Sequence, residues 1–231
     1  MIRYALVSVL ILFVDNLSAS DIVVEKPNKL FQLLQSNEGW DLINKDGDIA
    51  ISTKSIRDMN LAAYMVKKKT TIPSDIIQDI VMDVRNYDEY FNKNQSFVFR
   101  QLNKGHDWVE GHHYLPINIP LIKDREYFFR VHSNGYSLVD TTSIVHWYLT
   151  KSAENKGAEL NRDTIYLDYG AGLWMAEYLN KNNYILSYRL YIDPGGSIPD
   201  FAIELMNKAN IMNIFQNVIA EASSRIADDI P

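Results

Sequence analysis

The sequence contains no cysteine, only 7 prolines and 10 glycines among its 231 residues, and no large excess of one charge, with a formal net charge of -6. The absence of cysteine excludes disulfide scaffolds, thiolate metal sites and cysteine nucleophiles. The slightly acidic balance argues against a nucleic-acid-binding surface, so we expect no nucleic-acid partner. No repeat or proline- and glycine-rich linker divides the chain after its first twenty residues, which indicates a single domain over residues 21–231.

The first twenty residues have the pattern of a signal peptide. Arg3 supplies a short basic n-region, an apolar run of eleven residues follows at 4–14, and small residues occupy positions 18–20. Such a run is too short to span a bilayer and has the length of a signal-peptide h-region. We therefore expect residues 1–20 to be removed near Ser20 and the protein to be exported to the periplasm or the cell exterior. The alternative is an uncleaved signal anchor.

Hydrophobic periodicity divides the rest of the chain into helices and strands. Apolar residues at helical spacing predict helices over 27–35, 73–84 and 201–226, with a further helical turn over 87–91. Asp46-Gly47 predicts a hairpin between strands at 42–43 and 49–56. Further strands are expected at 60–72, 96–102, 107–115, 124–136, 138–150, 162–180 and 183–192. This order predicts an α+β fold in which a curved antiparallel sheet wraps around a long C-terminal helix.

Three segments resemble the START (steroidogenic acute regulatory protein-related lipid transfer) family. They are residues 120–127 (PLIKDREY), residues 188–199 (YRLYIDPGGSIP) and residues 87–90 (YDEY), in the family's order, and the resemblance covers about residues 27–228. It implies a helix-grip fold with a hydrophobic tunnel between the sheet and the terminal helix. It also implies non-enzymatic binding, and transfer, of one sterol-like or other lipid molecule.

Arg125 is the expected polar anchor of this tunnel. In a strand at 124–132, alternation places Arg125, Tyr127 and Phe129 on one face. The resemblance implies that such an arginine pairs with an acid on a neighbouring strand, and Glu110 is the nearest acid in the preceding strand. The alternative is a structural ion pair with Asp124, Glu126 or Asp168, because a buried unpaired arginine is strongly unfavourable.

The other expected lining residues are aromatic side chains and methionines. They are Trp174, Tyr184 and Tyr188 in the last strands, and Met206 and Met212 in the terminal helix. We expect a cavity of several hundred cubic ångströms, a common size for ligand pockets. Gly170 and Gly172 predict a bulge that curves the sheet. Gly195 and Gly196 are the expected hinge on which the terminal helix moves to admit a lipid.

Other chemistries find little support in the sequence. Adjacent His112 and His113 point to opposite faces of a strand, so we expect no metal. No nucleophile-elbow motif accompanies His146, and Gly170-Ala171-Gly172 is not a dinucleotide fingerprint, so we expect no catalytic residue and no cofactor. Lys67-Lys68-Lys69 indicates a solvated edge strand or a transient membrane contact. The alternatives to a monomeric lipid carrier are an aromatase/cyclase-type enzyme on this scaffold and a protein-interaction module with a filled interior.

Overall fold

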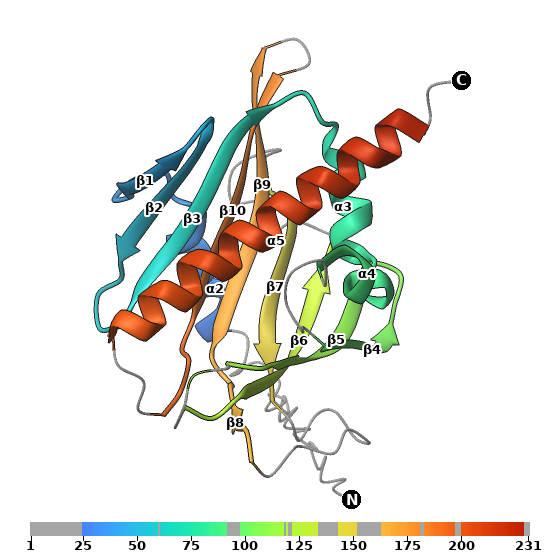
Figure 1. The fold of residues 1–231 in the computed structure, drawn as a ribbon. Helices are drawn as coiled ribbons and strands as arrows, with labels where there is room; N and C mark the ends of the chain where they lie inside the picture. Colours follow the sequence, from blue (N-terminus) through green and yellow to red (C-terminus); the bar gives the residue numbers. More distant parts are fainter. Residues whose placement is uncertain are drawn as a thin grey trace, which may run out of the picture.

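The computed structural model describes residues 25–59, 61–91, 98–117, 119, 122–133, 143–151, 163–180, 183–196 and 200–228. Within them, ten strands form one curved sheet in the order β1-β2-β3-β10-β9-β7-β6-β5-β4, and β8 pairs in parallel with the start of β6 (Figure 1). The strands are β1 (Asp41–Asp46), β2 (Ile49–Ser55), β3 (Ala62–Thr70), β4 (Val98–Lys104), β5 (Trp108–Leu115), β6 (Arg125–His132), β7 (Ser143–Thr150), β8 (Ile165–Tyr166), β9 (Gly170–Asn180) and β10 (Asn183–Ile192).

Helices cover both faces of the sheet. On the inner face lie α3 (Ser74–Met82), the short η1 (Val84–Asn86), α4 (Tyr87–Phe91) and the long α5 (Asp200–Asp228), which crosses the sheet diagonally (Figure 1). The main core fills the space between this face and α5. On the outer face, α2 (Glu25–Gln35) packs its apolar side, including Leu30 and Leu34, against Leu173 and Tyr191. Successive strand residues therefore alternate between two separate cores.

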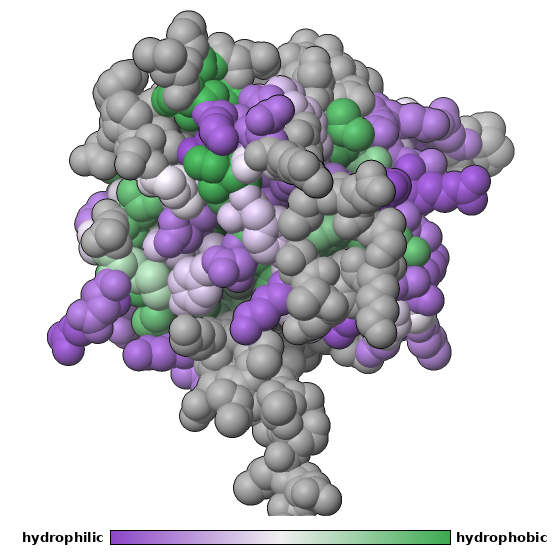
Figure 2. Space-filling view, turned by 90° about the horizontal axis from the view of Figure 1, so that it is seen from below, coloured by the Kyte–Doolittle hydropathy of each residue, from purple (hydrophilic) through white to green (hydrophobic). Residues whose placement is uncertain are grey.

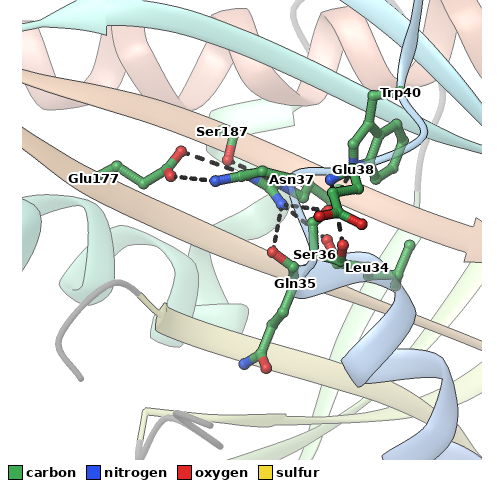
Figure 3. A network of polar contacts seen from close by, with 9 residues as sticks. Leu34, Gln35, Ser36, Asn37, Glu38, Trp40, Glu177 and Ser187 are labelled. Atoms are coloured by element: carbon green, nitrogen blue, oxygen red, sulfur yellow. Dashed lines mark hydrogen bonds and ion pairs between the residues drawn. The ribbon is translucent and has the colours of Figure 1, made fainter. Parts of the chain in front are cut away.

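A buried arginine holds the end of α2 on the outer face. Arg189 in β10 is 1% exposed. Its guanidinium contacts the last carbonyls of the helix and the side chains of Asn37 and Glu177 (Figure 3). The final carbonyls of a helix have no partner within it and carry the negative end of its dipole. A cation at this place therefore both satisfies and stabilises the helix terminus.

The structure corrects two of the sequence expectations about strands. The single strand expected over 162–180 is wrong, because β8 pairs for two residues with β6, residues 167–169 belong to no strand, and β9 begins only at Gly170. The expected bulge at Gly170 and Gly172 is also wrong, since β9 runs in regular register with β10 there. A Cβ atom on Gly172 would lie 2.6 Å from the ring of Trp147, so this glycine makes room for the indole.

The three consecutive lysines are not on an edge strand. β3, which carries them, pairs with β2 on one side and β10 on the other, and Lys68 Nζ lies 3.1 Å from Asp48 Oδ2. Lys67 and Lys69 are exposed on the outer face. The expected signal peptide, residues 1–20, lies outside the described residues. None of the described helices has the length and apolarity needed to cross a membrane.

Candidate ligand-binding site

Two cavities lie between the inner face of the sheet and α5. Their volumes are about 70 and 80 Å³. Five side chains line both cavities and form the partition between them: His113, Tyr127, Trp147, Tyr188 and Ile214. Beyond the partition, the first cavity is lined mainly by aromatic and aliphatic residues such as Phe91, Phe129, Val131, Trp174 and Val218. The second continues past Arg125, Leu190 and Asn210 to the link between β10 and α5.

In the part of the chain that the structure describes, the interior holds these two cavities in place of the expected single one of several hundred cubic ångströms. The interior is divided because aromatic side chains of β5, β6, β7 and β10 meet the inner side of α5 in its middle. Viewed from the end of the molecule near β8, hydrophobic residues of the described surface are interspersed with hydrophilic ones and form no broad apolar patch (Figure 2). A large ligand therefore has to displace part of the partition.

The expected lining residues divide into those at the cavities and those away from them. Tyr127 and Tyr188 line both cavities, Phe129 and Trp174 line the first, and Arg125 lines the second. Trp174 is 2% exposed and stacks between Tyr188 and Phe215, at centroid distances of 4.5 and 5.7 Å.

Two of the expected lining residues, Tyr184 and Met212, line neither cavity. Tyr184 lies at the start of β10, where its ring packs edge-on against Tyr178. Met212 packs against the edge of the main core, and residues 210, 211, 214 and 218 of α5 line the cavities instead. Met206 belongs to α5, but its side chain lies outside the described part of the structure.

Arg125 is on the inner face, as strand alternation predicts, but none of the described carboxylates accepts a hydrogen bond from it. Its Nε donates to the carbonyl of Pro194 at 2.9 Å and its Nη2 to that of Gly195 at 3.2 Å, while Nη1 donates to the carbonyl of Lys123. Burial lowers the pKa of Arg125, and the negative charge of Asp124 opposes that shift. Arg125 thus fastens the link between β10 and α5 to the start of β6.

That link is a defined turn. Gly195 and Gly196 have φ values of 59° and 65°, in the left-handed region that glycine enters most readily. The main-chain N–H of Gly195 donates to Asp193 Oδ1 at 3.0 Å. The expected hinge is therefore fixed by Arg125 and Asp193 in this structure.

Glu110 belongs to the outer face, so its expected pairing with Arg125 is wrong. In the β5–β6 register Glu110 stands opposite Arg130, and Arg130 Nε donates to Glu110 Oε1 at 2.9 Å. The guanidinium of Arg130 also lies over the ring of Trp108, 5.0 Å from its centroid. The physical reason is parity: even-numbered residues of β5 and β6 face outward, whereas Arg125 faces inward.

His113 is the functional candidate that sequence reasoning missed. Its Nδ1 lies 2.6 Å from Tyr127 Oη, and its ring stacks on Phe99 at 3.9 Å. Burial lowers the pKa of His113 to about 3, so the ring is neutral. The expected opposite orientation of the two histidines is confirmed, since His112 faces outward and lies 3.1 Å from Glu126 Oε2. The β5–β6 register, which the sequence does not reveal, places His113 opposite Tyr127 at the cavities.

The described residues contain no cluster of three or more histidine or acidic side chains suited to hold a metal ion. The ionisable groups at the partition are uncharged. Burial raises the pKa of Tyr127 and of Tyr188 above the usual range.

Comparison with known proteins shows the fold. No protein-family model and no curated protein matches the sequence. Among solved structures, human StAR-related lipid transfer protein 5 is similar with a TM-score of 0.67 and 13% identity, over 89% of this chain and 96% of that chain. A STAR-related lipid transfer protein from Xanthomonas axonopodis is similar with a TM-score of 0.62 and 15% identity, over 81% and 98% of the two chains. The chain therefore has the helix-grip fold of the START domains, as its sequence motifs predicted.

Proposed function

We propose that this protein binds one lipid molecule between its sheet and α5 and, acting as a monomer, transfers it without changing it chemically. The observation that carries the proposal is the pair of adjoining cavities, which are lined mostly by aromatic and aliphatic side chains and separated only by side chains. The likeness in fold to proteins named for lipid transfer supports the same function.

Burial of apolar surface would supply the affinity. Each buried methylene contributes about 0.8 kcal/mol, so a chain of ten methylenes gains about 8 kcal/mol before the entropy of binding is subtracted. Because the cavities measure only about 70 and 80 Å³, the ligand has to be accommodated by movement of the partition and of α5. Exposed Lys67 and Lys69 offer positive charge for transient contact with an anionic membrane during transfer.

The ionisable groups at the cavities favour carrying over catalysis. General acid–base catalysis works best when the pKa of the catalytic group is near the working pH. At the partition, the pKa of His113 is about 3, and those of Tyr127 and Tyr188 are raised by burial. Arg125 is held by main-chain carbonyls. This arrangement gives the aromatase/cyclase alternative no group poised for proton exchange.

Enlarging a partition residue should block lipid binding. Ile214 of α5 lines both cavities, so an indole in its place would occupy the path between them. After incubation of delipidated protein with vesicles of phosphatidylcholine and cholesterol, we expect native mass spectrometry to find one lipid per chain. With Ile214→Trp the bound fraction should fall at least tenfold, on the order of the affinity that two lost methylene contacts would provide.

The matched control is Ile219→Trp, because Ile219 lies on the same helix, is similarly half-buried and lines neither cavity. It should bind lipid as the unchanged protein does. Equal binding by both variants would show that lipid lies elsewhere. Failure of the unchanged protein to retain any lipid would overturn the proposed function itself.

We also propose that the protein is exported and that its mature form begins near Asp21. The basic, apolar and small-residue segments of residues 1–20 support this. Intact-mass measurement of protein from its native host should give a chain that lacks these residues, found in the periplasmic or extracellular fraction. An intact form starting at Met1 in the soluble cytoplasmic fraction would contradict the proposal.

A further inference from the structure

The side chains that separate the two cavities carry several polar groups. Four of the five side chains shared by the cavities have an N–H or O–H group: His113, Tyr127, Trp147 and Tyr188. Tyr127 Oη and His113 Nδ1 form a hydrogen-bonded pair, 2.6 Å apart. Because Tyr188 and Trp147 line the same two cavities, a ligand that spans the partition passes all four groups.

These groups can serve both a donor and an acceptor on a ligand. A phenol donates one hydrogen bond and accepts up to two, whereas an indole N–H only donates. The hydroxyl of Tyr188 can therefore donate to a ligand oxygen or accept from a ligand hydroxyl. For Tyr127, a proton directed to His113 leaves the oxygen as an acceptor, and a proton received from His113 leaves the hydroxyl as a donor. The tautomer of His113 can thus adjust Tyr127 to either kind of ligand group.

The partition carries no formal charge. Burial keeps His113 neutral, with a pKa of about 3, and raises the pKa of both tyrosines. An ionised ligand group placed here would lose its hydration without gaining a counter-ion, which is strongly unfavourable. The positive charge of Arg125 lies at the second cavity only, where its N–H groups donate to the carbonyls of Lys123, Pro194 and Gly195.

We propose that the partition is a hydrogen-bonding site for one uncharged oxygen of the ligand, so that the protein selects neutral lipids bearing a hydroxyl or carbonyl group. The apolar parts of the ligand extend from this oxygen into the two cavities. Tyr127 and Tyr188 make the contacts, and His113 orients the hydroxyl of Tyr127. The proposal rests on the proposed function and adds the chemical class of the lipid to it.

Three probes with the same chain length test this selection: octane, 1-octanol and octanoate. Binding to the delipidated chain is followed by the fluorescence of its tryptophans, of which Trp147 and Trp174 line the cavities. We expect 1-octanol to bind about tenfold more tightly than octane, the gain expected for one or two buried hydrogen bonds, and octanoate to bind at least tenfold more weakly than 1-octanol.

Removing a single hydroxyl identifies the site. Tyr127→Phe and Tyr188→Phe should each reduce the affinity for 1-octanol about fivefold to tenfold and leave the affinity for octane unchanged. Tyr191→Phe is the matched control, since Tyr191 is equally buried but lies in the outer core beneath α2. It should leave both affinities unchanged.

The outcomes separate this inference from the proposed function. Equal binding of octane and 1-octanol, with no effect of either partition variant, would overturn the selection of a neutral oxygen and leave apolar binding intact. Tighter binding of octanoate than of 1-octanol would also overturn it and would place the ligand head group at Arg125. Binding of none of the three probes would contradict the proposed function.

Discussion

Replacing Arg125 with methionine should lower the free energy of unfolding by about 3–5 kcal/mol and accelerate the release of bound lipid. Arg125 is 1% exposed and donates hydrogen bonds to three main-chain carbonyls. Methionine retains much of the apolar packing but leaves those carbonyls without a donor, at about 1–3 kcal/mol for each one that stays buried. Two of them belong to Pro194 and Gly195, so the connection to α5 should loosen.

Urea unfolding measures the first effect, and stopped-flow transfer of a bound fluorescent lipid to acceptor vesicles measures the second. The control is Arg57→Met in the turn between β2 and β3, because the side chain of Arg57 is exposed to solvent. Substitution of an exposed side chain away from the core usually changes stability by less than about 0.5 kcal/mol, so this control should change stability little and release not at all. Lowered stability with an unchanged release rate would show that the lipid leaves by a route independent of the link.

The sequence predicted the inward orientation of Arg125 but not its partners. Alternation in β6 fixes the face of each residue, and the sequence placed Tyr127 and Phe129 beside Arg125 for the same reason. The expected carboxylate partner was wrong because main-chain carbonyls leave no trace in a sequence: any residue at 194 or 195 would present one. The outward position of Glu110 depends on its register opposite Arg130, which the sequence does not reveal.

The divided cavity could not be predicted from the sequence. The partition depends on how the rings of Trp147, Tyr127 and Tyr188 pack against Ile214, which is decided by side-chain rotamers and by the position of α5. The space for Trp147 in turn requires Gly172 on the neighbouring strand, a contact between residues 25 positions apart. The two-residue pairing of β8 with β6 is also long-range and has no periodic pattern to reveal it.

The second buried arginine, Arg189, also donates hydrogen bonds to main-chain carbonyls, but on the opposite face of the sheet. Arg189 Nη1 donates to the carbonyls of Leu34 and Gln35 at 3.0 and 2.8 Å, and Nη2 donates to Asn37 Oδ1 at 2.7 Å (Figure 3). Glu177 Oε2 lies 3.5 Å from Nη2 and supplies the countercharge. Burial lowers the pKa of Arg189 to about 10, so the guanidinium remains charged at neutral pH.

Arg189→Met should therefore destabilise the protein by about 3–5 kcal/mol, since it leaves Glu177 without its cation and the last carbonyls of α2 without a donor. Hydrogen exchange should show that α2 loses protection first, because its docking depends on this contact. Lys54→Met is the matched control: Lys54 Nζ donates to a single carbonyl of the same helix, that of Leu33, at 2.7 Å, and its loss should remove only about 1 kcal/mol. Equal losses of stability for the two variants would show that Arg189 contributes no more than Lys54 to the docking of α2. Ligand affinity should be unchanged in both, since α2 and the cavities lie on opposite faces of the sheet.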